Sequence, residues 1–259
     1  MRDAIAAEWW KLCSVRSTRW VLAIVAAFVV LLLALAFQEA QIFDGLAPGR
    51  REKLALRPLQ EMSPWVTGLC MAVTGVLTAT SEYRSGTIRS SLVAVPRRSR
   101  LPAAKAVVVT AVSLAAGEAA TLGTFLGSRL VIGDRPFVDQ RAPLPHDLPG
   151  FGVEAVSVPV FALLGLALGL LLRSAAAAIT AVVLLWHVLP LLVFHLPAPW
   201  NERLGSVMLG GLGPRAAGHS VENSIYGGAL PPWGAAALML AYALLPLVVA
   251  VSVFARRDA

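Results

Sequence analysis

The residues that could do chemistry in this chain are few and widely spaced. Of its four histidines, the two nearest in sequence are His187 and His195, eight residues apart. A helical zinc site uses histidines four residues apart, so this pair does not match one. The sequence contains no H-E-x-x-H motif, no G-x-S-x-G elbow and no G-x-x-x-x-G-K-[ST] phosphate loop. We therefore expect no catalytic centre, no bound metal or cofactor, and no ATP hydrolysis by this chain itself.

One acid and two stripes of small polar residues are candidates for a substrate path. Glu118 lies inside a long apolar run, next to a helical stripe that includes Thr121. An ionisable group in such a run is costly unless it is paired or hydrated, which makes Glu118 a functional-site hypothesis. The alternative is a hydrogen bond to Thr121 or to a neighbouring helix. A second stripe comprises Thr67, Met71, Thr74 and Thr78.

Both stripes have a simpler interpretation. Small and hydroxyl-bearing residues allow helices to pack closely in membranes. The pairs Gly123-x-x-x-Gly127 and Gly165-x-x-x-Gly169 are consistent with such packing. We favour helix packing over substrate contact for the two stripes.

The most basic stretch of the chain is Ser81–Lys105, SEYRSGTIRSSLVAVPRRSRLPAAK, in which six basic residues face a single acid, Glu82. Gly86 can end the helix that enters this stretch, and Thr87 is a suitable N-cap for a new one. Glu82 could pair with Arg84, with Arg89 or with the N-terminal leader. The stretch therefore predicts a rigid elbow that leads into a short helix.

The short helix is predicted over residues 87–95, because Pro96 ends it. Its apolar face would carry Ile88, Leu92 and Val95. Such a face is buried in lipid or in the groove of a partner. The basic turn that follows, Pro96–Lys105, is expected to contact the anionic leaflet of a membrane.

Composition places these features in a membrane. Of 259 residues, 57% are hydrophobic and only 14% are charged, against roughly 25% charged in soluble domains. Apolar runs long enough to cross a bilayer recur along the chain. They cover residues 20–37, 62–80, 101–128, 153–172, 175–196 and 233–254, the fifth with a bend expected at Pro190. We predict an all-α integral membrane protein with six transmembrane helices in a single domain, 1–259.

The first nineteen residues are predicted to be an amphipathic leader that lies in the membrane interface, or that serves only as an anchor. A helix over residues 2–17 would place Ile5, Trp9 and Leu12 on one face and Asp3, Lys11 and Ser14 on the other. The formal charge of +7 fits the cytoplasmic bias of Lys and Arg better than nucleic-acid binding. That bias puts both termini in the cytoplasm of a cell whose plasma (inner) membrane holds the protein.

The chain resembles the permease subunits of ABC-2 type (type V) exporters, particularly the small actinobacterial ones. The resemblance rests on the leader AAEWWKLCSVRSTRW, on SEYRSGTIRSSLVAVPRRSR followed by Lys105, and on the six-span layout. Its most specific part is E-Y-R-x-G-T-x-R. Elsewhere the likeness is one of architecture.

The resemblance implies roles for particular segments. Residues 2–17 look like the family's connecting helix, and residues 87–95 look like its coupling helix, which docks on a separate ATP-binding subunit. Glu82 looks like the acid that ties the second span to the coupling region. Residues 201–230 look like the outer re-entrant hairpin. The expected coupling residues are Glu82, Gly86, Thr87, Ile88, Arg89, Leu92 and Val95.

The function implied is export of an amphiphilic substrate, such as a drug, antibiotic or lipid-like compound. Two permeases, identical or different, would assemble with two ATPase subunits that bind the ATP and Mg²⁺. The alternative is a membrane scaffold or sensor that transports nothing and recruits a cytoplasmic partner through residues 87–95. An intramembrane enzyme would need a titratable cluster that the sequence does not show.

Overall fold

The computed structural model describes residues 1–51, 59–88, 98–133, 135, 144–219, 225–227 and 230–256. Within these ranges the chain is helical and contains no strand. Six helical segments are long and apolar enough to cross a membrane. The predicted class, all-helical with six candidate transmembrane helices, is therefore confirmed.

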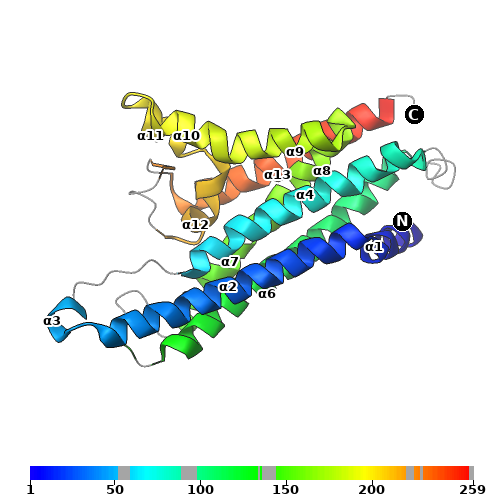
Figure 1. Ribbon diagram of the computed structural model, residues 1–259. Helices are drawn as coiled ribbons and strands as arrows, with labels where there is room; N and C mark the ends of the chain where they lie inside the picture. Colours follow the sequence, from blue (N-terminus) through cyan, green and yellow to red (C-terminus); the bar gives the residue numbers. More distant parts are fainter. Residues whose placement is uncertain are drawn as a thin grey trace.

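The six long segments run back and forth along one bundle (Figure 1). They are α2 (Arg16–Gly45), α4 (Met62–Ser85), α6 (Arg100–Ile132), α7 (Leu144–Ala155) with α8 (Ser157–Leu172), α9 (Ala175–Val183) with α10 (Leu189–Phe194), and α13 (Pro232–Arg256). Both chain ends lie at the same end of the bundle, with α1 (Arg2–Ser14). We call this the α1 end. The opposite end, where α12 (Leu212–Ala216) lies, is called the α12 end.

The leader is shorter than predicted. Helix α1 ends at Ser14, Val15 is extended, and α2 begins at Arg16, so residues 16–19 belong to the first long helix. The predicted apolar face is also partly wrong, because Trp9 is 44% exposed whereas Glu8 is buried beside Leu12. The helix is rotated so that a charged pair faces the bundle and the tryptophans face outward.

Residues 129–152, which lie between the third and fourth predicted spans, are largely helical where they are described. Helix α6 continues to Ile132, and α7 begins at Leu144 and contains Pro149. Phe151 and Ala155 of α7 are buried, and the ring of Phe151 lies 4.7 Å from that of Phe125 on α6. Tertiary packing of this apolar face outweighs the low helix propensity of the prolines.

The fifth long segment is interrupted where a bend was predicted. Between α9 and α10, residues Leu184–Val188 form a π-helical turn, η3, in which the Leu189 N–H donates to the Leu184 carbonyl. Pro190 follows directly and has no N–H to continue the α-helical pattern. The wider turn places Trp186 flat on Phe161 of α8, with ring centroids 3.5 Å apart.

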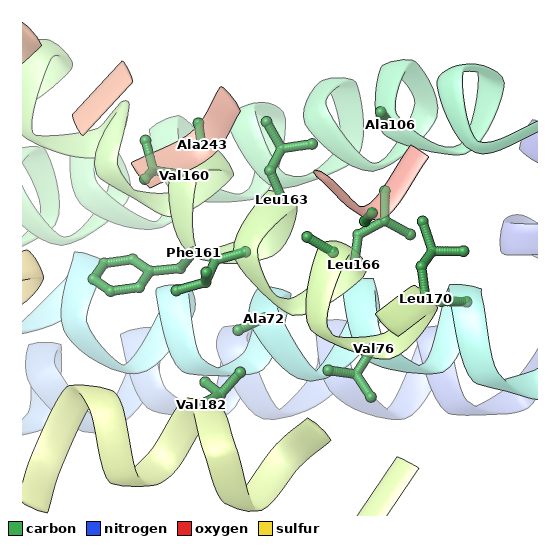
Figure 2. Close-up of a cluster of buried hydrophobic side chains, with 14 of the residues drawn as sticks. Ala72, Val76, Ala106, Val160, Phe161, Leu163, Leu166, Leu170, Val182 and Ala243 are labelled. Atoms are coloured by element: carbon green, nitrogen blue, oxygen red, sulfur yellow. The ribbon is translucent and has the colours of Figure 1, made fainter. Parts of the chain in front are cut away.

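Helix α8 lies at the centre of the bundle, and its backbone packs closely against that of α4 (Figure 2). A Cβ atom at Gly165 would overlap the Ala72 carbonyl of α4, and one at Gly75 would overlap the Ala162 carbonyl of α8. A Cβ atom at Gly127 of α6 would overlap the side chain of Leu33 on α2. Close helix packing, as predicted, therefore holds for Gly165, Gly169 and Gly127, whereas a Cβ on Gly123 would lie 4.0 Å from Val29.

Candidate functional site at the α1 end

Four charged side chains from three helices meet at the α1 end, and we call them the ion cluster: Glu8, Lys11, Glu82 and Lys105. The Lys11 Nζ donates to Glu8 Oε1 at 2.7 Å and to Glu82 Oε1 at 2.8 Å. The Lys105 Nζ donates to Glu8 Oε2 at 2.7 Å and to Glu82 Oε1 at 2.9 Å. Each lysine thus bridges the same two carboxylates.

The ion cluster is electrically neutral and largely removed from solvent. Glu8 is 3% exposed, Glu82 5% and Lys105 2%, while the Lys11 side chain is 47% exposed. Burial lowers the pKa of the Lys11 ammonium, but its hydrogen bonds to Glu8 and Glu82 raise it more, so the pKa lies above its usual value of 10.5. Each buried carboxylate of the ion cluster has a lysine partner, and an unpaired buried charge would be far more costly.

Local structure explains how each residue reaches the cluster. Glu8 and Lys11 are three residues apart on α1, which places them on one face of the helix. Glu82 lies in the last turn of α4, and Lys105 lies near the start of α6. Lys105 also donates to the carbonyl of Thr78 at 3.2 Å. The cluster therefore ties the leader to the ends of two long helices.

Of the three partners considered for Glu82, the structure shows the leader, through Lys11. Of the two other partners considered, Arg84 is exposed and Arg89 lies outside the described residues. Lys105 was assigned to a basic turn at the membrane surface, and this is wrong. It is a buried ion-pair partner, because α6 already begins at Arg100 and carries Lys105 into the bundle.

Helix α4 ends where the sequence predicted. Gly86 has φ +70°, a left-handed conformation that favours glycine, and its N–H donates to the Tyr83 carbonyl. The Thr87 hydroxyl lies 2.8 Å from that of Ser85. On the other side of this helix end, the Arg173 guanidinium lies 5.2 Å from the Tyr83 ring centroid. The end of α4 is thus held by side chains on two sides.

Ile88 does not present a free docking face. It is 7% exposed and belongs to the main core cluster together with Leu101 and Phe254. The left-handed turn at Gly86 is thus followed, two residues later, by a side chain that packs in the core. The other predicted coupling residues, Arg89, Leu92 and Val95, lie outside the described residues.

The two hydroxyl stripes lie in the helix interfaces. Thr67, Met71 and Thr121 are at most 1% exposed, and Met71 packs with Val109 and Val158. The hydroxyls of Thr74 and Thr78 donate back to the carbonyls of Cys70 and Thr74, at 3.0 and 2.8 Å. This geometry favours the packing interpretation within one chain.

Glu118 lies apart from the buried stripe. It is half-buried, and its Oε2 is 3.9 Å from where a Cβ on Gly152 of α7 would lie. Thr121 on the same helix is fully buried. Glu118 therefore lies at the α6–α7 contact, and its role in transport stays a prediction.

The α12 end has its own charged residue, Arg215, which the sequence analysis missed. It is 4% exposed and donates to the carbonyls of Ser206 at 2.6 Å and Tyr226 at 2.9 Å, and also to that of Gly227. Burial lowers the pKa of this guanidinium. Arg215 thus holds together the segment expected to be a hairpin, which contains α11 (Trp200–Gly205), η4 (Leu209–Gly211) and α12.

The missed residues each carried a weak signal in the sequence. Glu8 and Lys11 have the spacing of a helical ion pair, and Lys105 is a lysine set four residues into an apolar run predicted from residue 101. Glu154 is an acid inside the fourth predicted span, and Arg215 stands in the Gly-rich run GGLGPRAAGH. No protein-family model matches the chain, and no curated protein matches it.

Proposed function

We propose that the chain is the membrane subunit of an ATP-driven exporter of the ABC-2 type. The observation that carries the proposal is the ion cluster, which joins α1, the end of α4 and the start of α6. Residues 89–97 lie in the sequence between α4 and α6. A force applied to the connection between α4 and α6 would therefore move α1, α4 and α6 together and would not bend one helix alone.

The mechanism follows from this rigid unit. ATP binding closes a separate pair of ATPase subunits, and their movement displaces the connection between α4 and α6. Ile88, packed in the core, and Glu82, paired in the cluster, pass the displacement to α4. Because α4 and α8 touch through Gly75 and Gly165, tilting α4 shifts the centre of the bundle as well.

The proposed orientation puts the α1 end in the cytoplasm of a plasma (inner) membrane. Exposed arginines gather at this end, which agrees with the excess of Lys and Arg on the cytoplasmic side of membrane proteins. They are Arg16, Arg19, Arg84, Arg100, Arg173 and Arg256. Exposed Trp9 and Trp10 on α1 suit the headgroup region of the same leaflet.

The proposed substrate is an amphiphile that passes between two permease copies. Helices α2 and α13 leave most of their apolar side chains exposed in the single chain. Such faces contact lipid or a second six-helix subunit. Because the stripes on α4 and α6 are buried within one chain, the proposed path runs along this surface and not within one bundle.

The test is to co-express the chain with its neighbouring ATPase subunit and to purify the complex. We expect a stable complex whose ATPase activity rises with amphiphilic substrates. Arg84→Glu combined with Arg100→Glu should weaken the complex, because both side chains are exposed beside the connection. Arg203→Glu, exposed on α11 at the α12 end, is the matched control and should leave it intact.

Substituting the predicted docking residues Ile88 and Leu92 by aspartate would not test docking cleanly. Ile88 lies in the core, so Ile88→Asp would destabilise the fold itself. Failure to obtain any complex with the ATPase would contradict the proposal. A complex without substrate-stimulated ATPase activity or efflux would instead indicate the scaffold or sensor.

A further inference from the structure

A buried acid and a histidine face each other at the α12 end. Glu154 of α7 is 2% exposed, and its Oε2 lies 3.7 Å from His219 Nδ1. The His219 side chain is 33% exposed, so it reaches both the carboxylate and the solvent. Glu154 lies one residue before α7 ends, and His219 lies three residues after α12 ends.

The backbone holds His219 in this position. Gly218 is left-handed with φ +84°, and its N–H donates to the Arg215 carbonyl at 2.9 Å, while the His219 N–H donates to the Pro214 carbonyl at 2.9 Å. These paired bonds are the usual way to close a helix end with glycine. The imidazole then rests on Gly150, where a Cβ would lie 3.3 Å from Nε2.

Aromatic and backbone groups pack around the pair. The Phe151 ring centroid lies 5.6 Å from that of His219. A Cβ on Gly213 of α12 would lie 3.1 Å from the Cβ of Ser157 and 3.4 Å from the Glu154 carbonyl. Helix α12 is therefore seated on the α7–α8 junction, with the histidine at its edge.

Other charged side chains of the described residues belong to the helices that pack here. From α12, Arg215 turns away to backbone carbonyls. From α6, the Arg129 guanidinium lies 5.7 Å from the Phe125 ring, whose centroid is 4.7 Å from that of the tilted Phe151 ring. Glu118 of α6 lies beside Gly152. Among the described residues, Glu154 is therefore the acid that directly faces His219.

We propose that Glu154 and His219 form a proton-binding site that latches α12 onto α7. When the imidazole takes a proton from the medium, the imidazolium donates to the carboxylate and the buried pair becomes neutral overall. When the proton leaves, a buried carboxylate faces an uncharged ring and the attraction weakens. Histidine is the side chain that changes charge between about pH 5 and 8.

The latch acts on the whole α12 end, because α12 also carries Arg215. Closing it fixes the carbonyls of Ser206, Tyr226 and Gly227 relative to α7. Acidification of the compartment that this end faces therefore closes the α12 end, and neutral pH loosens it. The inference concerns this end alone and does not rest on the proposed exporter function.

Hydrogen exchange of the α12 backbone amides in the full-length, lipid-reconstituted protein tests the latch. After correction for intrinsic exchange, we expect α12 to exchange about three- to tenfold more slowly at about pH 5.5 than at about pH 7.5. His219→Gln and Glu154→Gln should both abolish this difference. His195→Gln is the matched control, since His195 is exposed and bonds to the Leu191 carbonyl.

Two results would overturn the latch: equal α12 exchange at both pH values in the wild type, or a pH difference that persists in His219→Gln. Because Glu154→Gln could disturb folding, exchange in α4 and α8 is measured in the same samples. If that variant is unfolded, His219→Gln alone decides, since its side chain is partly exposed and its loss leaves the core intact.

Discussion

The two ends of the bundle hold buried charge in different ways. At the α1 end, two lysines and two glutamates neutralise one another side chain to side chain. At the α12 end, Arg215 is satisfied by backbone carbonyls, and Glu154 faces a histidine. The first arrangement pairs fixed side chains of three helices with one another. The second depends on loop conformation and on a proton, so the α12 end is the adjustable one.

The largest expected effect comes from breaking the ion cluster at its most buried member. Lys105→Met leaves Glu8 and Glu82 buried with one half-exposed lysine between them. Removing one partner of a buried ion pair costs about 3–5 kcal/mol. Thermal unfolding of the protein in detergent should show this loss of stability. Arg100→Met, exposed on the same helix, is the control; equal stability of the two variants would show that the cluster does not hold the α1 end.

A smaller and local effect is expected at the α12 end. Arg215→Gln removes charge-assisted bonds to the carbonyls of Ser206, Tyr226 and Gly227, a loss of about 1–3 kcal/mol. Hydrogen exchange should quicken in α11 and α12 while α4 and α6 stay protected. Arg203→Gln on exposed α11 should change nothing. If hydrogen exchange quickened equally at the α1 end, the proposed difference between the two ends would be wrong.

The smallest effect is expected for Lys11→Gln. The Lys11 side chain is 47% exposed, so solvent screens its ion pairs with Glu8 and Glu82. The loss of stability should therefore be at most about 1 kcal/mol. Because the pKa of Lys11 is raised above 10.5, its contribution is fully present below that value and disappears only as pH rises beyond it. The stability difference from wild type should therefore be the same from about pH 6 to 9. A difference that changed within this range would mean that another group titrates in the cluster.

Patterns within short stretches of sequence predicted much of this protein. Apolar runs gave six candidate transmembrane helices, because burial of backbone polar groups in lipid demands helices of that length. Gly86 was predicted to end α4, and it does so with a left-handed turn. Glu82, the single acid of a basic stretch, was expected to need a partner, and the leader was one of those considered. The apolar runs and the end of α4 depend on neighbours in the chain, whereas the partner of Glu82 is 71 residues away.

Contacts between segments that are distant in the sequence decided the features that local patterns predicted wrongly. The rotation of α1, which turns Trp9 outward and Glu8 inward, follows from a lysine 97 residues away. The helix at residues 144–155 forms despite its prolines because Phe151 packs against Phe125. Ile88 looked like part of a docking face, but the turn before it places it in the core.

The sequence by itself determined the helical class, the number of long helices and the position where α4 stops. The tertiary structure alone decided which charges are buried together: Lys105 with Glu8 at one end, and Glu154 with His219 at the other. The physical reason is that hydropathy and helix termination act over one or two turns. The pairing of a buried charge depends on which helices the bundle brings within hydrogen-bonding distance.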